Sequence, residues 1–421
     1  MNAIRYARDA GYKVDGHLMP DLPGTTAEKD LQMISEVFLG EDLQLDYCKL
    51  YPCLDLPYTV TREWKKTGIW KPIAEHNFPV FLDILRHAMA IVPPWTRVNR
   101  VQRDFPEAQE RNGYLGFVSE TIKSNLQQMV IAELEKHGQA CYDIRSREIK
   151  NQFPVKFNDR ARLFIRCYRA SLGTEFFVSV EIPSREPKSQ DDAILMGLLR
   201  LRFPDYDVQR LLGMHPKTPL NLLPEFKSRI LARIRELHVY GNVKMVSKNA
   251  LLEDSKANSQ HTGVGRFLMA VAERVCMLYG FPSLATISGV GVREYYTKLG
   301  YHLDTGEGEY MIKDVNHRNL LPLNLFGHSL RDEDIYIPVS DFCICKDFLP
   351  VPGFKQSILG QLTTRSNYLK YNYPLIQQGK AELVIIDPNP PSSHFSAPNI
   401  KTLCAVVVIL FALWLAFMFE R

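Results

Sequence analysis

The chain of 421 residues carries a net charge of +4 at pH 7, which is too small to indicate a nucleic-acid partner by itself. With 46% hydrophobic residues it can bury a sizeable core, and its length favours two domains and a tail. The eight cysteines contain no C-x-x-C pair, so neither a disulfide framework nor a structural zinc site is indicated, and no metal site is predicted. The first residues lack the pattern of a secretory signal.

Helix and strand patterns alternate in the first part of the chain. The expected order is helix, strand, helix and strand, at residues 1–11, 12–19, 26–38 and 45–50. This spacing is typical of consecutive βα units in a parallel sheet or barrel, where sites lie at the carboxyl ends of the strands. His17 and Lys49 are near two such ends.

A basic region follows. Residues 95–169 hold 14 Lys/Arg against 9 Asp/Glu, a net charge of +5 that exceeds the total for the chain. Arg97, Arg100 and Arg103 recur every three residues beside Trp95. Such a cluster is able to contact RNA phosphates and to stack on an unpaired base. From these residues alone, a solvated basic face is the simpler interpretation.

The next part of the chain is rich in predicted strands. Residues 163–170, 175–182 and 193–202 are strand-like, and β-branched and aromatic residues predict another strand at 230–246. Residues 260–265 (QHTGVG) then separate this strand from a helical run at 266–279. A strand, a glycine turn and a helix therefore follow one another.

The glycine turn is suited to binding a phosphate. Gly263 and Gly265 can adopt positive φ and let successive N–H groups at the helix N-terminus point at a pyrophosphate. The turn has neither the Lys-Ser/Thr of a P-loop nor the third glycine of a dinucleotide fingerprint. A tight turn before a helix uses the same residues, and this alternative stays open.

Three blocks, RELHVYG, QHTGVG and ISGVGVREYYTKLGY, lie in order at residues 235–241, 260–265 and 287–301. A strand, Q-x-x-G-x-G, a helix, a strand and a short tyrosine helix resemble the acetyl-CoA core of the GNAT N-acetyltransferases. More narrowly, these blocks resemble the catalytic subunits of Elongator, which act on the wobble uridine of tRNA. The blocks HLMPDLP, KLYP and VPPWTRVNRVQRD, at 17–23, 49–52 and 92–104, are similar to the same family.

The resemblance implies an α/β fold in five parts. These are the C-terminal part of a radical S-adenosylmethionine (SAM) barrel, a connecting region, a GNAT domain, an extension with a linker, and a transmembrane tail, at residues 1–105, 106–160, 161–315, 316–399 and 402–419. The family's three-cysteine motif for a [4Fe–4S] cluster lies upstream of anything present, so we expect a chain incomplete at its N-terminus. The alternative is a half-barrel kept as a relic for binding.

Roles for single residues also follow from the resemblance. Acetyl-CoA is expected to contact Leu237, His238, Val239, Gln260, Gly263, Val264, Gly265, Arg266 and Tyr295. The candidate catalytic residues are Tyr295 or Tyr296, as donors to the departing thiolate, and Glu236 or His238, as bases. We place the two bases on opposite faces of the strand, so that at most one of them faces the substrate. The alternatives are an exposed glutamate, a histidine at the edge of the core and, for either tyrosine, a packing residue. Lys49 and Tyr51 are expected on the side of SAM, and Arg97, Arg100 and Arg103 to contact RNA.

Residues 403–419 are free of charge and follow a turn-rich linker at 387–399. They predict a tail anchor that holds the chain at the cytoplasmic face of the mitochondrial outer membrane or the endoplasmic reticulum. The expected function is acetyl-CoA-dependent modification of tRNA wobble uridine, with tRNA, and other Elongator subunits where the assembly forms, as partners. Two alternatives remain: a protein lysine acetyltransferase, acting on substrates such as histone or tubulin, and an inactive membrane-anchored RNA-binding scaffold.

Overall fold

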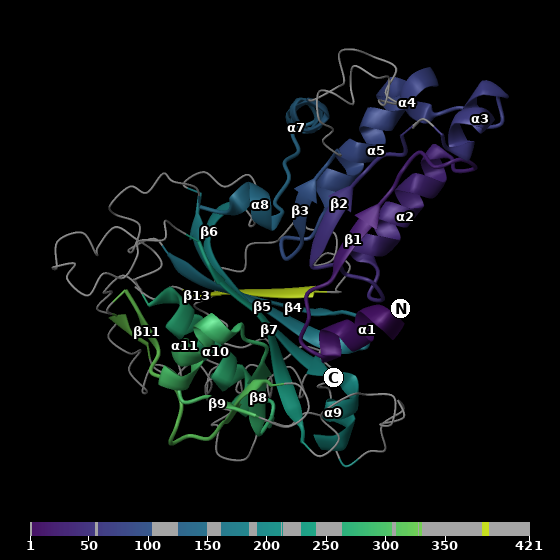
Figure 1. Ribbon diagram of the computed structural model, residues 1–421. Helices are drawn as coiled ribbons and strands as arrows, with labels where there is room; N and C mark the ends of the chain where they lie inside the picture. The colour runs from purple at the N-terminus through teal and green to yellow at the C-terminus, as the bar shows by residue number, and fades with distance from the viewer. Residues whose placement is uncertain are drawn as a thin grey trace, which may run out of the picture. The chain divides into compact units, whose positions relative to one another are not determined.

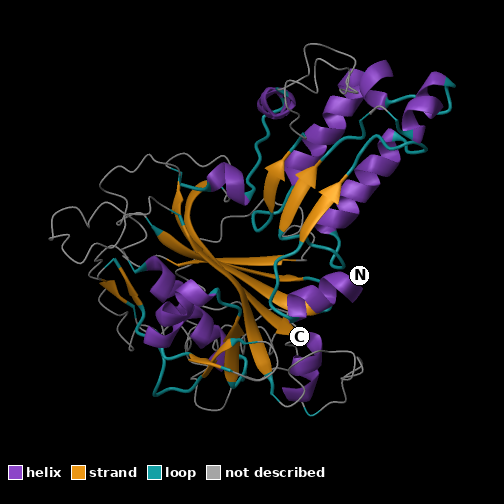
Figure 2. Cartoon of the chain, in the orientation of Figure 1, coloured by secondary structure: helices purple, strands orange, loops and turns teal. Residues whose placement is uncertain are grey.

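The computed structural model describes residues 2–54, 58–102, 125–149, 161–184, 192–211, 213, 229–240, 263–304, 309–326, 328–330 and 381–386. These residues belong to one compact unit, Met1–Pro388. Two sheets, one parallel and one largely antiparallel, organise it (Figure 1, Figure 2).

The first sheet is parallel and has the order β1-β2-β3. Its strands are β1 (Asp15–Leu18), β2 (Tyr47–Leu50) and β3 (Arg97–Arg100). In β2, buried Cys48 and Leu50 alternate with half-buried Tyr47 and Lys49, so one face is apolar and the other polar. The βα alternation predicted from the sequence is confirmed.

Helices cover the apolar face of this sheet. They are α2 (Ala27–Leu39), α5 (Phe78–Ile91) and α7 (Leu126–Lys136), which share one hydrophobic core with the strands. The Thr26 hydroxyl caps α2 by accepting from the backbone N–H of Lys29, and Asn77 caps α5 in the same way. Shorter helices complete this part: α1 (Asn2–Asp9), α3 (Val60–Lys66), α4 (Ile73–His76) and α8 (Ile144–Arg147).

The second sheet has eight strands in the order β13-β4-β5-β6-β7-β8-β10-β9. Its longer strands are β4 (Arg162–Arg169), β5 (Gly173–Pro183), β6 (Ala193–Pro204) and β7 (Leu231–Val239). The remaining strands are β8 (Ser283–Thr286), β9 (His302–Leu303), β10 (Met311–Asp314) and β13 (Ala381–Ile386). Neighbouring strands are antiparallel except β7 and β8, which are parallel. Strand β13 pairs with β4 and was not predicted.

A long helix, α10 (Val264–Leu278), packs on this sheet and fills its core with residues such as Phe267, Leu268 and Val271. Two short helices lie elsewhere along this part of the chain, α9 (Asp205–Leu211) after β6 and α11 (Arg293–Lys298) after β8. A small hairpin, β11 (Asn324–Leu325) and β12 (His328–Ser329), follows β10.

Strands β7 and β8 pair along only part of β7. Leu231–Ile234 face Ser283–Thr286, whereas the later residues of β7 pair with β6 alone among the described strands. The register with β6 also shifts, because Leu201 faces Ile234 and Arg200 faces Glu236, so that Arg235 is an extra residue in a β-bulge. The end of β7, beyond Ile234, therefore has no partner among the described strands on the side where β8 lies.

Candidate functional site

The N-terminus of α10 lies close to this end of β7. Gly263 caps the helix in the left-handed region, with φ at 81°, and its carbonyl accepts from the N–H of Phe267 at 2.9 Å. The N–H groups of the first turn and the exposed side chain of Arg266 form a positive end for the helix. Gln260, also predicted to bind acetyl-CoA, lies outside the described residues.

Gly265 lets Tyr295 and β7 approach the helix. A Cβ atom built on Gly265 would lie 3.0 Å from the Tyr295 Oη and 3.5 Å from a methyl carbon of Val239. On the opposite edge of β7, a Cβ on Gly197 of β6 would lie 2.9 Å from a methyl carbon of Val264. The sequence predicted Gly263 and Gly265 but not Gly197, whose only signal is a lone glycine within a strand.

The two adjacent tyrosines of α11 differ in their surroundings. Tyr296 is 7% exposed and belongs to the hydrophobic core, whereas Tyr295 is 37% exposed. Burial, with a smaller contribution from Tyr296, raises the pKa of Tyr295 to about 12. Tyr295 is therefore a neutral phenol at physiological pH, with its hydroxyl at the glycine turn.

The side chains of β7 divide between the two faces of the sheet. Leu237 and Val239 pack against the core under α10. Glu236 and His238 are two residues apart and therefore share the other face, so the prediction that they lie on opposite faces is wrong. His238 is exposed, and desolvation lowers its pKa, which favours the neutral imidazole.

Glu236 is held by three donors. Its carboxylate accepts from the Tyr47 Oη at 2.7 Å, the Arg200 Nε at 2.8 Å and the Lys13 Nζ at 3.3 Å. Burial alone would raise the pKa of Glu236, but Arg200 and Lys13 outweigh it and lower the pKa. The side chain is 9% exposed and is an ionised anchor, not a solvated glutamate.

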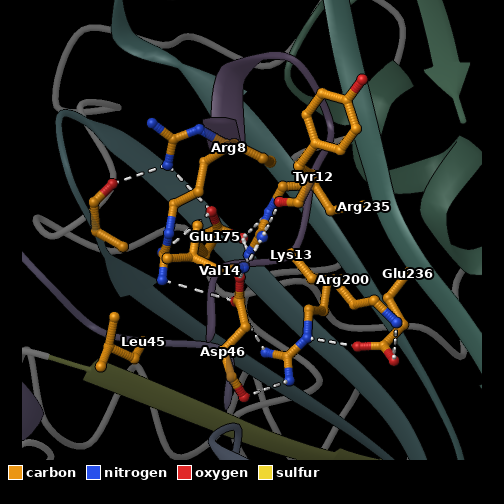
Figure 3. A network of polar contacts seen from close by, with 12 residues as sticks. Arg8, Tyr12, Lys13, Val14, Leu45, Asp46, Glu175, Arg200, Arg235 and Glu236 are labelled. Atoms are coloured by element: carbon orange, nitrogen blue, oxygen red, sulfur yellow. Dashed lines mark hydrogen bonds and ion pairs between the residues drawn. The ribbon is translucent and has the colours of Figure 1, made fainter. Parts of the chain in front are cut away.

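The β-bulge places two consecutive residues of β7 against two consecutive residues at β2. Arg235 forms bonds of 2.6 and 2.7 Å to the two carboxylate oxygens of Asp46 (Figure 3). The pair of Tyr47 with Glu236 lies next to this contact. Without the extra residue, Arg235 and Glu236 would project to opposite faces. The bulge thus joins the two sheets.

Further buried ion pairs lie beside the contact of Arg235 with Asp46. The Arg235 guanidinium also bonds the Glu175 carboxylate at 2.8 Å, and Arg202 bonds Glu175 at 3.0 Å and Asp9 at 2.6 Å. Burial opposes ionisation of Asp46, but the surrounding arginines lower its pKa below the usual range. The sequence analysis missed this network, although arginines at alternate positions of the apolar strands β6 and β7 are its signal.

Polar side chains of β1 and β2, and of Tyr51 after β2, gather on one face of the first sheet. The Lys49 Nζ lies 2.9 Å from an Asp15 carboxylate oxygen and 2.9 Å from the His17 Nε2, and the rings of His17 and Tyr51 are 5.4 Å apart. His17 thus contacts both Lys49 and Tyr51, and the assignment of these two residues to SAM stays a prediction.

The predicted RNA-contacting residues differ in their surroundings. Arg97 is engaged with the Glu148 carboxylate at 2.5 Å, and Arg100 is exposed at the end of β3. Arg103 lies outside the described residues. Trp95 is fully buried and stacks on Tyr168 with ring centroids 4.0 Å apart, so it is not available to an unpaired base.

No family model matches the chain. Curated relatives do match: Elongator complex protein 3 of Danio rerio is 37% identical over 320 residues, which are 74% of this chain and 50% of the relative. Elongator complex protein 3 of Saccharomyces cerevisiae is 36% identical, over 73% of this chain and 49% of the relative. A tRNA uridine(34) acetyltransferase of Methanocaldococcus infernus is 35% identical, over 75% of this chain and 53% of the relative. The chain spans about half the length of these relatives.

A solved structure is similar as well. The archaeal Methanocaldococcus infernus Elp3 with an N-terminal deletion (1–46) matches with a TM-score of 0.56 and 34% identity, over 75% of this chain and 66% of that one. The fold is thus a mixed α/β protein in which a parallel βα part is joined to a largely antiparallel sheet with a glycine-capped helix. The chain belongs to the Elongator complex protein 3 family, as the sequence blocks indicated.

The predicted tail-anchored location at a membrane is contradicted and is withdrawn. The relatives that match about three quarters of the chain are Elongator complex protein 3 and not a family defined by a membrane anchor. Among the described residues, no helix is long and apolar enough to cross a membrane. Residues 403–419, on which the prediction rested, lie outside the described residues.

Proposed function

We propose that this protein uses acetyl-CoA as the acyl donor in a modification of tRNA wobble uridine. The observation that carries the proposal is the convergence of three features: the end of β7 beyond its pairing with β8, the glycine-capped N-terminus of α10 and the Tyr295 hydroxyl. The names of the relatives, Elongator complex protein 3 and tRNA uridine(34) acetyltransferase, support tRNA as the substrate. Other Elongator subunits are proposed as partners on the same ground.

The domain assignment is part of the proposal. The parallel sheet and its helices are assigned to part of a radical SAM barrel, and the eight-stranded sheet with α10 and α11 to a GNAT domain. Two separate hydrophobic cores, one under each sheet, support this division. Helix α7 packs in the first of these cores, so part of the proposed connecting region, residues 106–160, belongs with the barrel.

Acetyl-CoA fits the described residues at the end of β7. Backbone N–H and C=O groups of Leu237–Val239 are proposed to pair with the pantetheine arm, as a neighbouring strand would. The first turn of α10 and Arg266 are proposed to hold the pyrophosphate. Tyr295 then lies beside the place where the arm passes the helix, because Gly265 lies next to both the Tyr295 hydroxyl and Val239.

Tyr295 is proposed as the general acid. When water or another acceptor attacks the acetyl carbonyl, the bond from carbon to sulfur breaks and the electron pair leaves on the sulfur of CoA. The neutral phenol donates its proton to this thiolate and regains one from solvent. Tyr296 is proposed to pack, and Glu236 to position β7. His238, neutral and on the face of β7 turned to the first sheet, remains the candidate base.

The family implies SAM and an iron–sulfur cluster. Among the described residues no group of three or more His, Cys, Asp or Glu could hold a metal, and the described cysteines 48, 53, 141, 167 and 276 are scattered over both sheets and their helices. The cluster does not fit these residues, and no step is assigned to it. Lys49 and Tyr51 are proposed only as contacts for SAM at the edge of the first sheet.

The test is the turnover of acetyl-CoA with tRNA, with lysine peptides, and with neither. The proposal expects release of CoA that tRNA stimulates and that Tyr295→Phe abolishes. Transfer to a peptide lysine that is independent of tRNA would indicate a protein acetyltransferase. Binding of tRNA without turnover under any of the three conditions would indicate a scaffold and would overturn the proposal.

A further inference from the structure

Residues 58–71 present an unusual surface in the crossover from β2 to α5. They include α3, on which no residue is buried. Because a crossover leaves a parallel strand at its carboxyl end, this segment begins at the same edge of the first sheet as Lys49 and Tyr51. Figure 1 shows α3 beside α4, at the far end of the helical layer.

Large apolar side chains of this segment are open to solvent. Tyr58 is 98% exposed, Ile69 71%, Val60 63% and Trp64 39%. Monomeric proteins rarely keep several such side chains together on a surface without a partner. A ligand or partner for this surface is therefore expected.

The charge of the segment selects the partner. Residues 58–71 contain four basic side chains and one acidic, a net charge of +3 in 14 residues, against +4 for the whole chain of 421. The basic residues are Arg62, Lys65, Lys66 and Lys71, interleaved with Tyr58 and Trp64. Basic and aromatic side chains in alternation are suited to phosphates and to unstacked bases.

The segment is anchored to the body of the protein. Trp70, 4% exposed, is buried behind the helix, and its backbone N–H donates to the Trp64 carbonyl at 3.0 Å. Lys65 pairs with Glu75 of α4. Lys66 and Glu63 pair in the solvent, with side chains 63% and 64% exposed. One side of residues 58–71 is thus attached to the protein, and the opposite side faces solvent and can bind a partner without rearrangement of the core.

We infer that residues 58–71, with Trp64 and Lys66 at the centre, form a contact surface for single-stranded RNA. This inference rests on the proposed function and deepens it, because it places part of the tRNA contact on α3. It is favoured over the Arg97 region, where Trp95 is buried and Arg97 is bound to Glu148. It is favoured over a protein partner by the excess of positive charge.

The experiment measures the affinity of the purified protein for whole tRNA and for a short single-stranded RNA, over a range of salt concentrations. Lys66→Glu and Trp64→Ala are compared with the wild type and with Lys136→Glu. Lys136 is a matched control because it also pairs at i,i+3, with Glu133 of α7, and is 72% exposed. None of the three side chains is buried, so all variants are expected to melt as the wild type does.

Trp64→Ala is expected to weaken binding of both RNAs about fivefold to 100-fold, with an unchanged salt slope, because stacking on a base is lost. Lys66→Glu is expected to weaken binding. It is also expected to reduce the slope of log K against log salt concentration by about one or more, because at least one phosphate contact is lost. Lys136→Glu is expected to change neither, and acetyl-CoA turnover without RNA is expected to stay the same in all. If the wild type binds tRNA and both α3 variants bind it equally well, α3 is not an RNA surface, and the proposed function still stands. If the wild type binds no RNA, both fall.

Discussion

The hydroxyl of Tyr47 donates a 2.7 Å hydrogen bond to the carboxylate of Glu236 and so connects the two sheets at one point. Two residues beyond Tyr47 along β2 is Lys49, and directly after Glu236 along β7 begins the stretch assigned to acetyl-CoA, at Leu237. The edge proposed for SAM therefore lies on β2 and the edge proposed for the acyl donor on β7, and the side chains of Tyr47 and Glu236 link these two strands. A shift at this bond would move both.

Tyr47→Phe and Glu236→Gln are expected to be coupled in stability. Tyr47→Phe removes one of the three donors to Glu236, and Glu236→Gln replaces the charged acceptor by a neutral amide, so each should lower the free energy of unfolding by about 1–3 kcal/mol. The double variant should cost less than the sum, by at least about 0.5 kcal/mol. Denaturant unfolding of the four proteins measures this coupling. Tyr12→Phe, at a side chain 57% exposed, should change the free energy of unfolding by less than about 0.5 kcal/mol. Strict additivity would show that the bond is not formed.

Tyr295→Phe and Tyr296→Phe should separate chemistry from packing. Removing the Tyr295 hydroxyl should lower kcat for CoA release about 100-fold or more with little change in melting temperature, because a general acid is lost. Tyr296→Phe should keep most of the activity, because its ring packs in the core. Rates measured at saturating acetyl-CoA decide between the two residues. Equal losses in both variants would remove Tyr295 from its proposed role.

Substitutions of the two glycines of the turn should have different effects, one on stability and the other on catalysis. Gly263→Ala forces alanine to a φ of 81°, so it should lower the free energy of unfolding by about 1–2 kcal/mol. Gly265→Ala brings a methyl group to 3.0 Å from the Tyr295 hydroxyl and should displace it, lowering kcat about tenfold to 100-fold. Unfolding and turnover are measured for both. Full activity in Gly265→Ala would show that the position of the phenol does not matter.

Glu181 should make stability depend on acid. Burial would raise its pKa, but Arg147 and Arg166 outweigh this and lower the pKa to about 2 from 4.5. A lowered pKa in the folded state means that the stabilisation is complete above pH 4.5 and is lost as the pH falls toward 2. At pH 7, Glu181→Gln should cost about 3 kcal/mol, and this difference from the wild type should shrink between pH 4.5 and 2. A difference that is constant over this range would contradict the ion pairs.

Much of the fold could be predicted because its signals are local. The βα alternation, the strands of the larger sheet and the helix after the glycine turn follow from periodicity and from Gly263. The neighbourhood of Gly265 and Tyr295 follows from the resemblance of three blocks. Strand β13 was missed, because its pairing with β4 joins residues more than 200 positions apart.

The side-chain contacts between the two sheets could not be predicted, because they join residues far apart in the sequence and no local pattern encodes them. Glu236 looked like a surface carboxylate or a base, and only the contacts with Tyr47 and Arg200 reveal an anchor. The bulge at Arg235 reverses the side of the strand on which each later residue is expected. Trp95 shows the same limit, since a tryptophan among arginines looked available and is stacked on Tyr168 in the core.

We propose that acetyl-CoA lies between the end of β7 and the start of α10. Amide hydrogen exchange with and without acetyl-CoA tests it most directly, under conditions where calorimetry shows binding. We predict slower exchange at Leu237 and the first turn of α10, because their N–H groups would bond the ligand. Bound acetyl-CoA that leaves exchange at these amides unchanged, and slows it elsewhere, would contradict the account.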